Sequence, residues 1–95
     1  MLAEAEARAQ FIDEEIEVRF ATKPGPPTSF VWRGKEYRIV EILSWRRKLD
    51  LRRRWWQRRH RDYYVVRTDT GQVFEIYLHR APGRRYWVLF RELVT

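Results

Sequence analysis

The chain contains no cysteine, which excludes a disulfide framework, a thiolate metal site and a cysteine nucleophile. Small domains without disulfides suit a reducing compartment, so we expect a cytoplasmic protein. Long apolar runs are also missing, and none approaches the roughly 18 residues that a membrane-spanning helix needs. The first residues, Met-Leu-Ala-Glu-Ala-Glu-Ala-Arg, lack the basic start and apolar centre of a secretory signal. We therefore expect no membrane partner.

The sequence also lacks the clusters of side chains on which catalysis and metal binding depend. It has two histidines: His60 lies among arginines, which repel a metal cation, and His79 alternates with Tyr77 on an expected strand. No glycine-rich phosphate loop is present, and no serine precedes a histidine in a recognisable order. We therefore expect no catalytic residues, no metal and no cofactor, and hence a non-enzymatic function.

Aromatic residues are abundant, with five Trp, five Tyr and five Phe in 95 residues. A chain of this length forms one small domain, and these large rings supply its core. Apolar and polar residues alternate in most segments, as in Ile16, Val18 and Phe20, which predicts half-buried strands. Glycines at Gly34, Gly71 and Gly83 mark turns. The expected strands are residues 15–21, 29–33, 36–44, 62–69, 72–80 and 86–93.

These strands predict an all-β fold, a small antiparallel meander of about six strands curled into a partly open barrel. Small all-β chains curl because curling protects the edge strands from pairing with other chains. Phe74, Ile76 and Leu78 mark an inward face. Residues 1–12 begin with an Ala/Glu/Arg-rich segment that predicts a short N-terminal helix or flexible tail. Residues 13–95 then form the single β domain.

Charge is concentrated in one stretch, residues 45–62. Between Arg46 and Arg61 lie nine of the 20 basic residues and one of the 13 acidic residues, so the rest of the chain is nearly neutral. Arginine fills so many positions that we expect a long irregular excursion from the β domain, with a helical turn near residues 50–57. Long loops in compact domains are usually functional or disordered.

The excursion also carries aromatic residues, notably Trp55 and Trp56. Cations interleaved with flat rings favour a nucleic acid, which offers phosphates and bases together. A solvated loop that its tryptophans pin to the core is the alternative. Since adjacent side chains point apart, we expect Trp56 in the core and Trp55 exposed. The candidate nucleic-acid-binding residues are Arg46, Arg47, Lys48, Arg52, Arg53, Arg54, Trp55, Arg58, Arg59 and Arg61.

Several segments together suggest a family. They are residues 32–43, Arg54-Trp55-Trp56, the run from Arg61 to Val66, residues 71–77 and residues 85–89. They resemble the small uncharacterised domain at the C-terminus of catalytically inactive Y-family polymerase homologues of the bacterial mutasome, in a stand-alone version. The resemblance implies a role near damage-tolerant DNA synthesis, in binding DNA or a partner polymerase, without catalysis by the domain.

Two functions therefore remain open. The first is a nucleic-acid-binding accessory module linked to DNA repair or translesion synthesis, with DNA preferred to RNA as the partner. The second is a protein-interaction module that docks an acidic partner such as a polymerase. Nucleic acid requires a row of cations with exposed rings, whereas a protein partner requires an apolar centre with a charged rim. The sequence leaves the oligomeric state undetermined.

Overall fold

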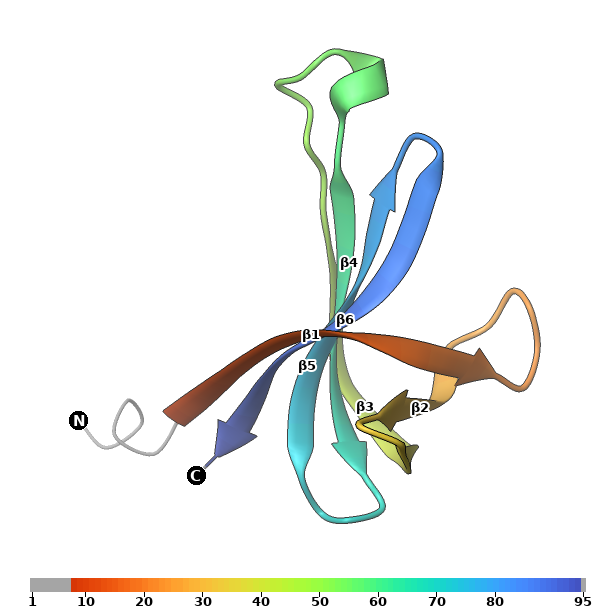
Figure 1. The fold of residues 1–95 in the computed structure, drawn as a ribbon, viewed down its shortest axis with the longest axis vertical. Helices are drawn as coiled ribbons and strands as arrows, with labels where there is room; N and C mark the ends of the chain where they lie inside the picture. The colour runs from red at the N-terminus through yellow and green to blue at the C-terminus, as the bar shows by residue number, and fades with distance from the viewer. Residues whose placement is uncertain (1–7, 95) are drawn as a thin grey trace.

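The computed structural model describes residues 8–94, with the exception of the Trp55 side chain. Within this range six antiparallel strands follow one another in chain order and form a closed barrel (Figure 1). One 3₁₀ helix, η1, separates the third strand from the fourth. The strands are β1 (Arg8–Phe20), β2 (Pro27–Trp32), β3 (Lys35–Lys48), β4 (His60–Thr68), β5 (Val73–Ala81) and β6 (Arg84–Val94), and η1 is Trp55–Gln57. The predicted all-β meander is confirmed.

Strand β1 closes the barrel because it pairs with two neighbours. Its first part pairs with β6 as far as Ile16, and its last part, from Glu17, pairs with β2. The register shifts between Phe11 and Glu14, and there Asp13 has a φ of 56°. Such a bulge bends a strand and increases its twist. The barrel is therefore closed, where the sequence predicted a partly open one.

The core lies inside this barrel and is largely aromatic. Phe30, Phe74, Ile76 and Leu89 are fully buried. The Phe30 ring stacks on Tyr37 with centroids 5.3 Å apart and meets Phe74 edge-on at 5.7 Å. The inward face predicted for Phe74 and Ile76 is confirmed. Its third member, Leu78, is only half-buried, and its ladder neighbours are Asp62 and Trp87 instead of residues of the fully buried core.

The predicted turns are present at Gly34, Gly71 and Gly83. Gly71 has a φ of 85°, which non-glycine residues rarely adopt, and its amide donates to the Thr68 carbonyl at 2.9 Å. This closes the β4–β5 hairpin as the Asp69-Thr70-Gly71 pattern predicted. Gly34 likewise has a φ of 78° between β2 and β3.

The N-terminal prediction requires correction. Residues 8–12 were expected to belong to a helix or tail, but they are extended, and residues 8–11 pair with β6. The pairing with β6 decides their conformation, because ten isolated residues gain little from helix formation in water. The rest of that prediction concerns residues 1–7, which lie outside the described residues. None of the described residues forms a helix long and apolar enough to cross a membrane.

The cationic stretch also differs from the expected irregular excursion. Strand β3 continues to Lys48 and β4 begins at His60, so both ends of the stretch are paired strand. We call residues 45–64 the hairpin arm and residues 49–59 its tip. Figure 1 shows the arm extending from the barrel on the same side as the β5–β6 hairpin. The predicted helical turn is present as η1, which the Gln57 amide closes by donating to the Arg54 carbonyl at 2.7 Å.

Candidate nucleic-acid interface

The predicted basic residues divide into two groups, according to whether they lie in the strands of the hairpin arm or in its tip. Arg46 belongs to the first group and faces Tyr63, its direct partner in the β3–β4 ladder. Its guanidinium lies 4.4 Å from the centre of the Tyr63 ring and 3.7 Å from the carboxylate of Glu75. Glu75 is buried and also pairs with Arg91 at 2.7 Å. Arg46 therefore helps to neutralise a buried charge.

Arg47 projects to the opposite face and makes a similar contact. Its Nε donates to Oδ1 of Asp62 at 3.0 Å. Asp62 is buried, and Nε of Arg80 on β5 donates to its other oxygen at 3.1 Å. Two guanidinium groups thus compensate one buried carboxylate, as buried charges require. Arg47 therefore forms an ion pair within the fold, and its charge is already compensated by Asp62.

Arg61 lies on the same face as Tyr63 and Tyr77. Its guanidinium donates to the Tyr63 hydroxyl at 3.2 Å and lies 4.7 Å from the centre of the Tyr77 ring. The hydrogen bond from Arg61 to Tyr63 raises the pKa of the Arg61 guanidinium above its usual value, against the opposing effect of burial. Arg61 therefore stays fully charged while it covers two buried tyrosines.

The cations of the tip, and Lys48 at its edge, have few acidic partners among the described residues. Asp50 is the one acidic residue there, and it lies 3.6 Å from Nε of Arg53. The Arg58 side chain donates to the Arg53 carbonyl at 2.9 Å, which leaves its charge uncompensated. Among the described residues no carboxylate forms an ion pair with the side chains of Lys48, Arg52, Arg54, Arg58 and Arg59. A hollow of 620 Å³ on the arm is lined by Lys48, Leu49, Asp50, Leu51, Arg52, Arg53, Arg59 and Arg61.

The tryptophan prediction is wrong for Trp56. Its side chain is half exposed, and the Arg54 guanidinium lies 5.5 Å from its ring. Residue 56 lies in η1 at the end of the arm, beyond the barrel (Figure 1), so the barrel core is out of its reach. The Trp55 side chain is outside the described part of the structure. The side chain of Trp45 is also half exposed, and the centre of its ring lies 6.5 Å from that of Tyr64.

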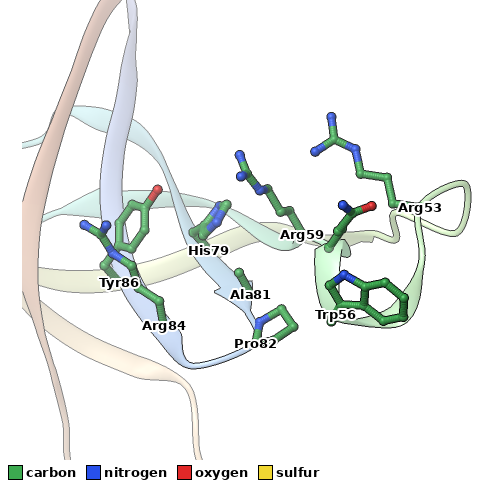
Figure 2. A pocket seen from close by; sticks show the side chains of 9 residues that line it. Arg53, Trp56, Arg59, His79, Ala81, Pro82, Arg84 and Tyr86 are labelled. Carbon is green, nitrogen blue, oxygen red and sulfur yellow. The ribbon is translucent and has the colours of Figure 1, made fainter.

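A cavity of 640 Å³ lies between the tip and the β5–β6 hairpin (Figure 2). The pairing of β4 with β5 brings these two segments together. Sequence reasoning identified Arg53 and Arg59 but interpreted residues 81–86 only as a turn followed by a strand. The Arg84-Arg85-Tyr86 run repeats the mixture of cation and ring seen in the tip and was the available signal. The lining residues are Arg53, Trp56, Gln57, Arg59, His79, Ala81, Pro82, Arg84 and Tyr86.

His79 is the unusual member of this cavity. It is buried, and its ring stacks on Tyr86 with centroids 4.7 Å apart. Burial, together with the charges of Arg61, Arg59 and Arg84, lowers the pKa of His79 below its usual value. The neutral form of the ring is therefore favoured, and within the described part of the chain Nδ1 has no hydrogen-bond partner. No group of three or more acidic residues or histidines among residues 8–94 is placed to hold a metal ion.

The chain belongs to the family described as "Domain of unknown function (DUF6504)", whose sequence pattern matches residues 5–94. Comparison with curated proteins and with solved structures gave no match. The family is thus established over nearly the whole chain, while its description assigns no activity.

Proposed function

We propose that this member of the DUF6504 family is a non-enzymatic module that binds nucleic acid with the tip of its hairpin arm. The observation that carries the proposal is the concentration of uncompensated cations there beside the half-exposed ring of Trp56. Phosphates supply the missing negative charge, and bases supply flat partners for an aromatic ring. The basic residues without a carboxylate partner among the described residues of the arm are Lys48, Arg52, Arg54, Arg58, Arg59 and Arg61.

The barrel arginines support the proposal by contrast, because several of them form ion pairs within the fold. Each forms an ion pair with a carboxylate of a different strand. Their charges are therefore offset locally, whereas those of the tip remain available to a polyanion and raise its local concentration. These pairs are Arg19 with Glu36, Arg33 with Glu14, Arg67 with Glu41, and Arg91 with Glu75.

The proposed partner is DNA, and the proposed setting is DNA repair or translesion synthesis in the cytoplasm. The resemblance to the C-terminal domain of inactive Y-family polymerase homologues motivates this choice. The described arm contains no α-helix that could enter a major groove and read base edges. We therefore expect binding with little sequence specificity, in which phosphate contacts dominate.

A titration with labelled oligonucleotides tests the proposal. We expect binding at low salt, measured by fluorescence anisotropy on single-stranded DNA, duplex DNA and RNA. If about four to six cations meet phosphates, the slope of log K against log salt is roughly −3 to −4 on a single strand and −4 to −5 on duplex. Absence of binding at low salt would refute the proposal.

One observation favours a second candidate, an interaction module that docks an acidic protein such as a polymerase. Leu49 and Leu51 lie among the arginines of the tip and are 50% and 64% exposed. Apolar side chains surrounded by charges are typical of a protein interface. Titration with an acidic peptide separates the candidates, because peptide binding that requires Leu51, without oligonucleotide binding, supports the second and excludes the first.

A further inference from the structure

We infer that the cavity between the arm tip and the β5–β6 hairpin holds one unpaired nucleotide of a single strand. In this arrangement the phosphate lies among Arg53, Arg59 and Arg84, and the base lies against Trp56. The inference rests on the proposed nucleic-acid binding and adds the form of nucleic acid that is preferred.

The charge of the cavity identifies an anion as its ligand. Among the described residues that line it, the charged ones are Arg53, Arg59 and Arg84 and none is acidic; Arg53 shares its charge with Asp50, which lies outside the lining. Arg53 and Arg59 come from the tip and Arg84 from the β5–β6 hairpin, so two separate segments contribute (Figure 2). Planar guanidinium groups match the oxygens of a phosphate and bind them bidentately.

The remaining lining residues favour an aromatic group attached to that anion. Trp56 lines one side of the cavity and is half exposed, while Tyr86 and His79 stack on each other on the other side. Arg84 lies 4.6 Å from the centre of the Tyr86 ring, so this wall is already ordered before a ligand arrives. A cavity with one ordered wall loses little freedom on binding.

His79 supplies the polar group that such a ligand requires. Buried polar atoms are normally hydrogen-bonded, yet Nδ1 of His79 has no partner within the described residues. In the neutral form of the ring, which burial favours, one nitrogen donates a hydrogen bond and the other accepts one. That chemistry suits the edge of a base or a ribose hydroxyl, and it leaves the negative charge to the arginines.

The size of the cavity is also consistent with one nucleotide. Its volume of 640 Å³ lies within the range of about 300–1,000 Å³ that is usual for sites of small molecules. A base within a duplex is stacked and paired, so it cannot enter without being flipped out, which costs free energy. The cavity therefore favours single-stranded over double-stranded nucleic acid.

The test measures the affinity of three variants for a labelled 15-nucleotide single strand and for its duplex. Trp56→Ala and Arg84→Ala change the cavity, and Arg38→Ala removes an exposed arginine of the barrel that does not line it. We expect Trp56→Ala to weaken single-strand binding by roughly 5- to 150-fold, the range for loss of one base–aromatic stack. We expect Arg84→Ala to weaken it more than Arg38→Ala does, with smaller effects of all three variants on duplex binding. Thermal melting checks that each variant is folded.

The outcomes separate this inference from the proposed function. Equal losses on single strand and duplex, or losses no larger than that of Arg38→Ala, overturn the nucleotide cavity while binding by the arm stands. If the wild-type protein binds neither oligonucleotide at low salt, both the inference and the proposed function are wrong. Trp56 lies in the arm tip and Arg84 in the β5–β6 hairpin. A folding defect confined to one segment would therefore not explain a loss of binding in both variants.

Discussion

Arg47 on β3 and Asp62 on β4 are direct neighbours in the β3–β4 ladder, and Nε of Arg47 donates to Oδ1 of Asp62 at 3.0 Å. The Asp62 side chain is only 7% exposed. An arginine near the start of the cationic stretch thus pairs with an acidic residue of the next strand. The contact shows that high local charge does not by itself mark a residue as a contact for a partner.

The first prediction concerns this pair. Arg47→Ala should lower the free energy of unfolding by about 1–2 kcal/mol, because Asp62 keeps Arg80 but loses one of its two charged donors. Urea denaturation measures the change. The matched control is Arg52→Ala, which removes an exposed arginine without a carboxylate partner in the described structure and should change stability by less than about 0.5 kcal/mol. Equal effects of the two variants would contradict the structural role of Arg47.

The second prediction concerns the core. Ile76→Ala should cost about 2–4 kcal/mol of unfolding free energy, because a fully buried side chain is lost and leaves a cavity. Ile42→Ala makes the same chemical change at a position that is 37% exposed, and it should cost clearly less. Thermal and urea denaturation of both variants provide the measurement. A similar cost at the two positions would be inconsistent with the packing described above.

The third prediction separates stability from binding in the arm tip. Changing Arg52, Arg53 and Arg54 together to alanine should leave the melting temperature nearly unchanged or raise it slightly, because repulsion between like charges is relieved. The same change should reduce the magnitude of the single-strand salt slope by roughly 2, at about 0.7 for each lost phosphate contact. Arg38→Ala serves as a barrel control for the slope. Unfolding of the triple variant would show that these arginines are needed by the fold.

The fourth prediction concerns pH and His79. Burial and the neighbouring arginines lower the pKa of His79 from its usual 6.5, so the unfolded chain takes up this proton at a higher pH than the folded chain. Stability contributed by the neutral ring is therefore present above pH 6.5 and decreases as the pH falls toward the folded-state pKa, by up to about 1.4 kcal/mol per pH unit.

His79→Gln tests this linkage because glutamine keeps a polar group but does not titrate. The decrease in melting temperature from pH 7.5 to pH 5.5 should be smaller in His79→Gln than in the wild type. His60 and the carboxylates are common to both proteins, so the difference between the two profiles reports His79 alone. Parallel profiles would show that the pKa of His79 is not lowered in the fold.

Much of the fold could be predicted because the signals are local. Alternation over residues such as Ile16 and Val18 reports the two faces of a strand, and Gly34 and Gly71 report turns that need positive φ. The pairing of residues 8–11 with β6 could not be predicted, since it joins segments from opposite ends of the chain. The same long-range contact turns a meander into a closed barrel.

The sequence predicted which residue types the candidate site contains, but it did not predict how the fold arranges them. The sequence by itself determined that charge and aromatic rings are concentrated between Arg46 and Arg61, because composition does not depend on folding. The tertiary structure decided which of those cations are used internally, since strand register places Arg47 beside Asp62, while among the described residues most cations of the tip have no acidic partner. It also decided that His79 and Arg84 belong with the tip, because only the pairing of β4 with β5 brings the β5–β6 hairpin next to it.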